Sequence, residues 1–246
     1  MKTIRLTTFN IQHGRLYQQP GDVIDLAKMA EVADGTGATV FGFNEVRKGP
    51  SDGSIKGYPD TPAVLSRLLG GQAVFGHAVD FGPGRGYGNL LISRVPILES
   101  DVIPIQDPDP RTGDQYYETR NIIRTKIDCG ECRLTVMVSH FGLNTDEQEN
   151  AVSTVIRLLE REKGPVVLMG DLNLCPDSPF YSRLASCLTD AAAAAGIPEP
   201  TFPSDAPERR IDYIFIRSAR AAEAHVVPIV ASDHRALTAE IELPAR

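Results

Sequence analysis

Carboxylate, amide and imidazole side chains follow short apolar runs at several points of this chain. Gly170-Asp171-Leu172-Asn173 comes after one such run, and Asp233-His234 lies near the C-terminus. Carboxylate and amide oxygens suit a hard cation such as Mg²⁺, and an imidazole can take a proton from water. Hydrolysis of a phosphoester needs such groups around a cation and a water. We therefore expect metal-assisted phosphoester hydrolysis.

Two residues that follow predicted strands are the candidate ligands of the cation. Asn10 ends a strand that starts at Leu6, and Glu45 comes just after the apolar run from Thr39 to Phe43. If these strands are neighbours in one sheet, both side chains reach the same rim. Taken singly, Glu45 is more often a solvated loop carboxylate and Asn10 a turn former. The prediction of a Mg²⁺ site, with Mn²⁺ as the alternative ion, therefore depends on both residues together.

The strand before Gly170 predicts where its polar neighbours point. Alternation along an extended chain places Asp171 and Asn173 on the same side, where they can face a phosphate or its attacking water. The glycine allows a tight approach of the backbone. The alternative is an Asx-turn that simply ends the strand.

Asp212 stands between apolar neighbours and would need a partner to stay ionised when buried. His234 is the predicted partner, because a carboxylate fixes the imidazole tautomer and makes the ring a stronger base for water. In the alternative interpretation, Asp212 caps a strand and pairs with Arg209 or Arg210.

Further polar groups lie close to these positions in the predicted layout. Asp233 adjoins His234 and can offer a carboxylate to a metal or phosphate site, and His140 ends a strand where it can hydrogen-bond a phosphate oxygen or protonate a leaving group. The remaining histidines are predicted to be surface or packing residues: His13, His77 and His225.

The elements that must position these groups alternate between strands and helices. Strands are predicted at 6–10, 39–43, 89–93, 121–128, 133–140, 165–169, 211–216, 226–230 and 236–243. Helices are predicted at 23–33, 63–69, 145–161, 179–185 and 190–195, and loops at 48–62, 81–88 and 103–116. No linker or composition break divides the chain, so we expect one α/β domain over residues 1–246.

The amino-acid composition limits which kinds of partner the protein is expected to bind. Lys and Arg number 25 and Asp and Glu 32, so the net charge of −7 gives no global attraction to nucleic acid or an anionic membrane, although a local basic groove stays open. The N-terminal apolar stretch is too short and interrupted for a secretory signal, and no run approaches the roughly 18 apolar residues of a membrane span. We expect a cytoplasmic protein without integral membrane association; the oligomeric state cannot be predicted.

The Cys129–Cys132 spacing resembles a zinc motif, but a hairpin turn between two strands is the preferred interpretation.

The motifs as an ensemble resemble the endonuclease/exonuclease/phosphatase superfamily of DNase I-like nucleases, exonuclease III-type enzymes and neutral sphingomyelinases. In family order they are Thr8-Phe9-Asn10, Asn44-Glu45-Val46, Gly88-Asn89-Leu90, Ser139-His140, Gly170-Asp171-Leu172-Asn173, Arg210-Ile211-Asp212-Tyr213 and Ser232-Asp233-His234. The resemblance spans nearly the whole chain and implies a DNase I-like four-layer αββα sandwich, with two packed mixed sheets flanked by helices.

The resemblance also implies a role for each matching residue. Those at the Mg²⁺ are Glu45, Asn10 and Asp233; those at the water and phosphate are Asp171, Asn173 and His140; and His234 is the base, oriented by Asp212. One departure is Asn44, where the family usually has Gln. Because Asn is shorter, we expect a contact behind the metal ligand to change while Glu45 keeps its place.

The substrate is less defined than the chemistry. We expect a small or single-stranded phosphodiester; a DNA endonuclease or exonuclease is the competing enzyme, and a catalytically silent binding scaffold is the alternative of another class. Candidate substrate-binding residues are Asn89, which follows a glycine-rich loop, and Arg120, which enters a strand after an irregular loop. Surface solubility explains Arg120 equally well.

Overall fold

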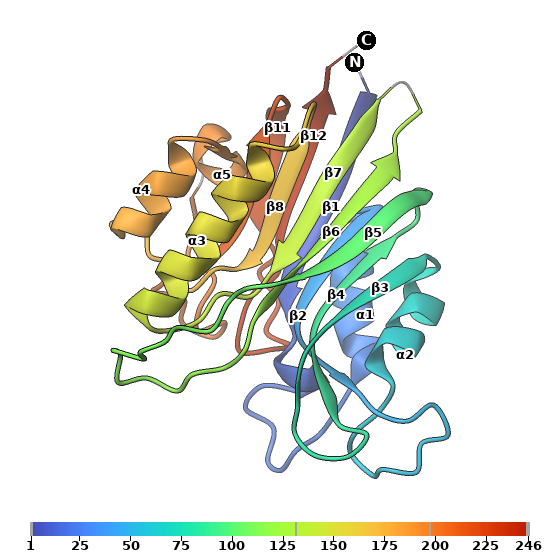
Figure 1. The fold of residues 1–246 in the computed structure, drawn as a ribbon. Coiled ribbons are helices and arrows are strands. Elements are labelled where there is room, and N and C mark those ends of the chain that lie inside the picture. The colour runs from blue at the N-terminus through green and yellow to red at the C-terminus, as the bar shows by residue number, and fades with distance from the viewer. Residues whose placement is uncertain (1, 131, 197, 245–246) are drawn as a thin grey trace.

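Two mixed sheets of six strands each pack face to face across the described residues 2–130, 132–196 and 198–244 of this computed structural model (Figure 1). The first sheet has the order β11-β12-β1-β2-β4-β3, and the second has the order β5-β6-β7-β8-β10-β9. The first sheet contains β1 (Lys2–Asn10), β2 (Val40–Lys48), β3 (Gln72–Asp80), β4 (Gly86–Ser93), β11 (Arg220–Val226) and β12 (Leu237–Leu243). The second contains β5 (Ile97–Pro104), β6 (Asn121–Asp128), β7 (Arg133–Ser139), β8 (Val166–Asp171), β9 (Thr189–Asp190) and β10 (Asp212–Arg217).

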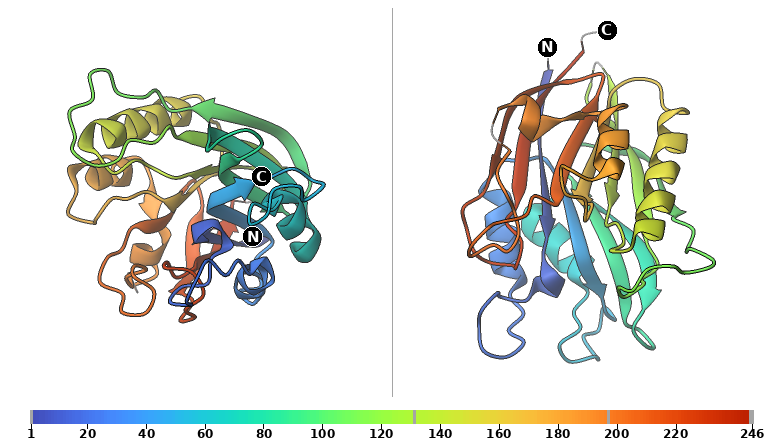
Figure 2. Two further views of the ribbon diagram at one scale, coloured as in Figure 1. Left: turned by 90° about the horizontal axis from the view of Figure 1, so that it is seen from below. Right: turned by 90° about the vertical axis from the view of Figure 1, so that its left-hand side faces the viewer.

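Helices cover the outer faces of both sheets (Figure 2). They are α1 (Leu26–Asp34) and α2 (Thr61–Leu69) on the first sheet, and α3 (Thr145–Leu159) and α4 (Pro179–Ala185) on the second. The short helix α5 (Ala191–Ala194) packs instead with the core between the sheets, beside β10 and β11, and a 3-10 turn η1 spans Gln12–Gly14. Asp25 and Asp60 cap α1 and α2 by accepting backbone N–H groups, which satisfies donors that a helix start leaves unpaired. The result is the predicted four-layer αββα sandwich.

Three apolar layers hold the four layers together. Val40, Val138 and Met169 belong to the layer between the sheets, where alternate strand residues of both sheets meet. Phe9 packs with α1 and α2 in a second layer, and Phe215 packs with α3 and α4 in a third. These layers are apolar, and the polar side chains of the predicted site lie beyond them, toward one end of the strands.

Strand register carries the predicted site residues to one rim. Parallel pairing of β1 with β2 sets Asn10 beside Asn44, and antiparallel pairing of β8 with β10 sets Asp171 beside Asp212. Gly170 has φ +147°, and a Cβ there would lie 1.8 Å from the carbonyl oxygen of Ser139. Only glycine lets β8 approach β7 this closely, a packing reason that the sequence did not indicate.

Several element predictions were wrong. The strand predicted at 226–230 lies earlier, as β11, and ends at Val226, before Pro228, which lacks the backbone N–H that a ladder needs. Strand β3 was not predicted, and β5 was assigned to no element except for its last two residues, which were called loop. Both are edge strands with many exposed residues, so neither shows a strong apolar pattern. Part of the loop predicted at 81–88 also belongs to β4.

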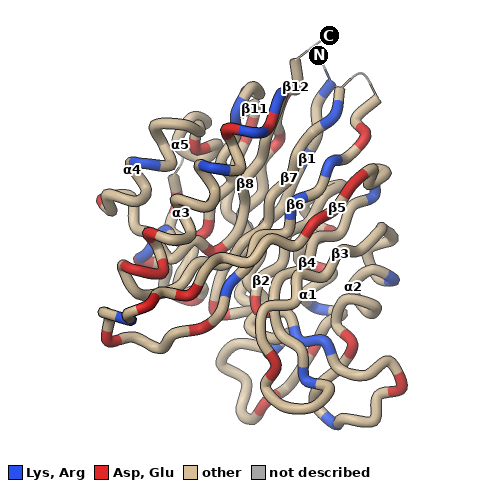
Figure 3. Tube along the Cα trace, in the orientation of Figure 1, with Lys and Arg blue, Asp and Glu red and all other residues tan. Residues whose placement is uncertain are grey.

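Other predictions hold in detail. β6 and β7 form the hairpin predicted around Cys129, with Asp128 opposite Arg133, and α3 begins at Thr145, the first residue of the helix predicted there, with Asn144 as its N-cap. Within the part of the chain that the structure describes, none of the helices has the length and apolar character needed to cross a membrane. Lys and Arg are interspersed with Asp and Glu along the chain, and the loops at the lower end carry residues of both charges (Figure 3).

Candidate active site

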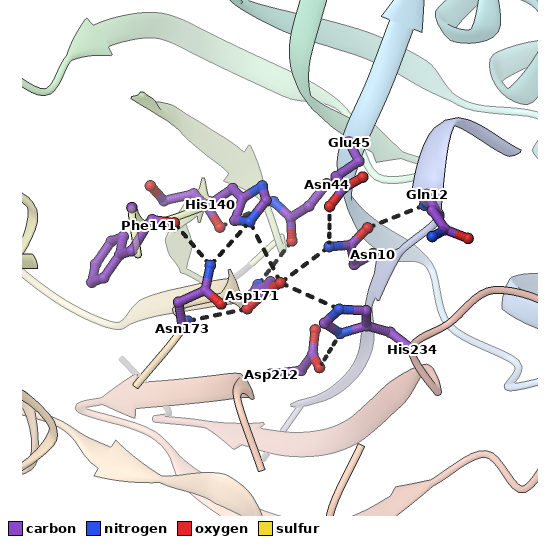
Figure 4. Close-up of polar contacts among 12 residues, drawn as sticks. Asn10, Gln12, Asn44, Glu45, His140, Phe141, Asp171, Asn173, Asp212 and His234 are labelled. Carbon is purple, nitrogen blue, oxygen red and sulfur yellow. Dashed lines mark hydrogen bonds and ion pairs between the residues drawn. The ribbon is translucent and has the colours of Figure 1, made fainter. Parts of the chain in front are cut away.

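Asp171 is the group on which the site converges (Figure 4). Its Oδ2 atom accepts a hydrogen bond from Asn10 Nδ2 at 3.0 Å and lies 3.5 Å from Nε2 of both His140 and His234. The carboxylate is buried, and burial, aided by the charge of Asp212, raises its pKa even though His234 acts in the other direction. Two imidazoles therefore face a carboxylate that binds a proton unusually well.

His234 is held by Asp212 as the sequence predicted. Its Nδ1 lies 2.8 Å from Asp212 Oδ2, so Nε2 is the nitrogen that points to Asp171. Burial opposes protonation of the ring, but the charges of Asp212 and Asp171 outweigh burial and raise the pKa of His234. The alternative pairing of Asp212 with Arg210 is not formed, because Arg210 bonds Asp190 at 2.5 Å.

His140 is oriented from its other side by Arg120. Arg120 Nη1 lies 3.0 Å from His140 Nδ1, and because a guanidinium only donates, Nδ1 accepts and Nε2 carries the hydrogen. Burial, and then the charge of Arg120, hold the pKa of His140 well below its usual range. Arg120 is nearly buried, and its Nε atom has no partner among the described residues. The neutral His140 ring can therefore donate its Nε2 hydrogen, and it lies beside Arg120, whose guanidinium still has a donor without a partner.

Asn10 links Asp171 to Glu45 on the neighbouring strand. Its Nδ2 also donates to Glu45 Oε1 at 3.0 Å, and its Oδ1 accepts from the backbone of Gln12. Glu45 has φ +58°, and the pairing of β2 with β4 shifts register at this point. Such a bulge re-aims a side chain at the end of a strand and is common beside active sites.

Asn173 and Asp233 complete the rim. The backbone of Asn173 donates to Asp171 Oδ1 at 3.0 Å, so the Asx-turn and the placement of both side chains at the site coincide. Asn173 Nδ2 lies 3.2 Å from His140 Nε2. Burial raises the pKa of Asp233; His234 counteracts this, and Glu45 adds to it. Asp233 Oδ1 accepts a hydrogen bond from Ser232 Oγ at 3.0 Å, and its role at a cation stays a prediction.

Asn44 and Asn89 form a layer behind the site. Asn44 Oδ1 accepts from the backbone N–H of Asp171 at 2.8 Å, and its Nδ2 donates to Asn89 Oδ1 at 2.7 Å. Asn89 in turn donates to Asn121. Asn89 is buried and its amide is already engaged, so the structure gives it a positioning place rather than a contact with a ligand. The shorter amide of Asn44 fixes the backbone of the central aspartate.

The acidic side chains fit a divalent cation. Glu45, Asp171 and Asp233 are partly or fully buried, and among the described residues none of them forms an ion pair with Lys or Arg. Buried carboxylates that repel one another are stabilised by a cation, and oxygen donors suit a hard one. Ligand atoms of Asp171, Asp212 and His234 also lie within 4.8 Å of one another. Asp212 and His234 are already joined by a hydrogen bond, so the side of Asp171 that faces Glu45 is the better place for a cation.

The sequence missed three residues of this site. His13 was predicted to lie on the surface or in packing, but its Nε2 is 3.7 Å from Glu45 Oε2, and burial, then Arg47, lower its pKa to about 4. The rings of His13 and Tyr87 meet edge to face, and burial raises the pKa of Tyr87. Glu118 bonds Arg120 at 2.5 Å. Of the three, only His13 could have been found from the sequence, because it lies three residues after the predicted site residue Asn10.

Comparison with known proteins shows the family of this chain. The sequence pattern of the Endonuclease/Exonuclease/phosphatase family matches residues 7–234, from β1 to His234. This chain belongs to the endonuclease/exonuclease/phosphatase family. Members of the family hydrolyse phosphoester bonds and generally depend on a divalent metal.

Three relatives illustrate how the family is represented. An uncharacterised protein of Escherichia coli K12, YbhP, is 24% identical over 214 residues, 77% of this chain and 76% of its own. A family structure from Beutenbergia cavernae aligns with TM-score 0.85 and 26% identity over 99% of this chain and 72% of that one. A mannosyl-6-phosphatase from Bacteroides thetaiotaomicron aligns with TM-score 0.75 and 15% identity, covering 97% and 99%. The last likeness shows the fold alone.

Proposed function

We propose that this family member is a Mg²⁺-dependent phosphodiesterase that uses His234 to activate water. Mn²⁺ is the alternative ion, a small or single-stranded phosphodiester is the preferred substrate, and residues 1–246 act as one domain. The observation that carries the proposal is the position of Asp171 Oδ2, 3.5 Å from both imidazoles and 3.0 Å from Asn10. The contacts of Asn10 with Glu45 and of Asp171 with both imidazoles support an enzyme over the scaffold alternative.

The cation would be held by Glu45, Asn10 and Asp233. When bound, it supplies charge that stabilises the phosphoryl oxygens and offsets the carboxylates that keep the pKa of His234 high. In the structure Asn10 Nδ2 bridges Glu45 and Asp171, and its Oδ1 accepts from the backbone of Gln12, so the amide would have to turn to offer its oxygen to the cation.

His234 is the proposed base. Its Nδ1 hydrogen is donated to Asp212, so a neutral ring has its lone pair at Nε2, which faces the site. As the water oxygen attacks phosphorus, Nε2 takes the proton, and the bond to the leaving alkoxide breaks in line. Asp212 is a positioning residue that stabilises the imidazolium formed in this step.

His140 and Arg120 are the proposed phosphate-binding pair. Arg120 fixes His140 with its Nε2 hydrogen directed toward the site, where it donates to a phosphoryl oxygen. Asn173 adds an amide beside it. Preorganised donors of this kind stabilise charge that develops in the transition state.

A substrate panel tests the proposal. Purified protein is offered bis-p-nitrophenyl phosphate, p-nitrophenyl phosphate, single-stranded DNA and plasmid DNA, each with Mg²⁺, Mn²⁺ or EDTA. We expect metal-dependent turnover of the diester and no plasmid nicking. Nicking of the plasmid would establish the DNA nuclease instead, exclusive turnover of the monoester would make the protein a phosphatase, and inactivity on all of them would favour the scaffold.

A further inference from the structure

A basic groove opens beside the proposed active site. Its cavity has a volume of about 380 Å³ and is lined by three cations, Arg47, Lys56 and Arg85, and by the aromatic rings of Tyr58 and Phe81. This volume lies in the usual range for small-molecule sites. The loops that supply its lining lie at the lower end of the molecule, where Figure 3 shows both basic and acidic residues.

The walls of the basic groove are tied together by specific contacts. The hydroxyl of Tyr58 donates to the carbonyl oxygens of Arg85 at 2.9 Å and Gly86 at 3.0 Å, which joins the loop after β2 to the start of β4. The guanidinium of Arg47 lies 5.1 Å from the centre of the Tyr58 ring, within cation–π distance. The ring and the loop therefore hold Arg47 in place before any ligand arrives.

The charge of the basic groove is not neutralised from within. Among the residues that the structure describes, no ion pair is found for Arg47, Lys56 or Arg85, and the last two are exposed. The one acidic residue of the lining, Asp22, is itself paired with Arg15 at 3.4 Å. In a chain of net charge −7, three unpaired cations around one cavity select for an anion.

The basic groove lies near the reaction centre along β2. Arg47 follows Glu45 by two residues on β2, about 7 Å along the strand. It lies opposite Tyr87 on β4, whose ring contacts His13 on one side and Phe81 on the other, with centroids 5.6 Å and 5.2 Å away. A substrate that extends from Glu45 along β2 would therefore come to Arg47, the first cation of the basic groove.

We propose that the basic groove binds a second phosphate group of the substrate, distal to the phosphoester that is hydrolysed. Arg47, Lys56 and Arg85 pair with this phosphate, and the exposed ring of Phe81 contacts the body of the molecule between the two phosphates. The inference rests on the proposed function for the reaction itself, but it makes a separate claim about affinity.

Two matched substrates test the inference. Thymidine 5′-(p-nitrophenyl phosphate) and the same ester carrying a 3′-phosphate differ only in the distal phosphate. We expect the parent protein to prefer the second by about tenfold in kcat/KM, mainly through KM, because charge-assisted contacts to phosphate are strong. In Lys56→Ala/Arg85→Ala the ratio should fall toward one. Arg67→Ala, which removes a cation from exposed α2 outside the basic groove, should keep the ratio.

A binding measurement separates failure of this inference from failure of the proposed function. Thymidine 3′,5′-bisphosphate and thymidine 5′-monophosphate are titrated by calorimetry in EDTA, without turnover. Tighter binding of the bisphosphate, lost in Lys56→Ala/Arg85→Ala and kept in Arg67→Ala, supports the basic groove even if no ester is hydrolysed. Equal affinity for the two ligands, or a preference that survives in the double variant, overturns the inference even if the enzyme is active.

Discussion

Single residues in this site act through the protonation state that their neighbours impose. The two central imidazoles share one carboxylate but have opposite partners: Asp212 holds His234, and Arg120 holds His140. An acidic partner raises the pKa of His234, whereas burial and a basic partner lower that of His140. The same residue type thus serves as a proton acceptor in one place and a neutral donor in the other.

His234→Ala tests the assigned base. We expect kcat on a phosphodiester to fall by about 10²- to 10⁴-fold, the usual range for a general base, with the circular dichroism spectrum unchanged. Asp212→Asn should cause a smaller loss, because the ring keeps a hydrogen-bond partner but loses its charge. His225→Ala, on the exposed edge strand β11, is the matched control and should resemble the parent. Parental activity in His234→Ala would remove His234 from the mechanism.

His140→Gln tests the electrostatics of the buried donor. Folded His140 stays neutral below the ordinary histidine pKa of about 6.5, whereas the unfolded chain takes up a proton there. This group therefore lowers stability as pH falls below about 6.5, until the folded pKa is reached, by about 1.4 kcal/mol per pH unit. The glutamine variant, which can still accept from Arg120, should lose less stability in acid.

Urea unfolding of parent and His140→Gln at pH 7, 6 and 5 measures that difference. A parallel loss in the two proteins would show that His140 becomes protonated within the folded state.

Strand ends are the elements that make the site possible. Asn10 and Asp171 are the last residues of β1 and β8, whereas Glu45 lies at a bulge within β2. At Gly170 the backbone passes so close to Ser139 that the strand pair tolerates no side chain. The elements therefore supply the precision that flexible loops would not.

Gly170→Ala should be among the most destabilising single substitutions in the chain. Its Cβ would lie 1.8 Å from the Ser139 carbonyl oxygen at a φ of +147°, so β8 must shift, and we expect a loss of about 3 kcal/mol or more together with loss of activity. Gly164→Ala is the control, because φ there is also positive at +99° but nothing lies within 4 Å of the added atom. It should cost about 1 kcal/mol in urea unfolding. Equal effects would show that β7 and β8 can separate freely.

The whole molecule places both sheets around one polar rim. Asn10 and Glu45 come from the first sheet, and Asp171, Asp212 and His140 from the second or its strand ends, so the site lies where the sandwich opens. A cation at Glu45 and Asp233 would join residues nearly two hundred positions apart. Metal binding should therefore raise the free energy of unfolding of the whole domain.

A saturating divalent cation should raise the melting temperature. A cation at 100 times its Kd adds about 2.7 kcal/mol, which for a chain of this size corresponds to roughly 5 to 10 °C. Glu45→Gln should lose most of the shift, whereas Glu149→Gln, an exposed carboxylate paired with Arg183, should keep it. Differential scanning fluorimetry with Mg²⁺, Mn²⁺ and EDTA provides the measurement. An undiminished shift in Glu45→Gln would place the cation elsewhere.

The sequence by itself determined the chemistry and the central strands. Buried strands carry apolar runs with polar residues at their ends, so β1, β8 and β10 and the groups Asn10, Asp171 and Asp212 were readable from local pattern. The pairing of Asp212 with His234 followed because a buried carboxylate needs a partner.

Only the tertiary structure decided which residues lie around that core of groups. The edge strands β3 and β5 are stabilised by their neighbours rather than by their own pattern, and His13, Tyr87 and the basic groove come together through strand register and loop contacts. Asn89 entered a strand as predicted yet lies behind the site, because packing of the two sheets buries its amide against Asn121. Local sequence specifies what a residue can do, whereas long-range packing specifies what it faces.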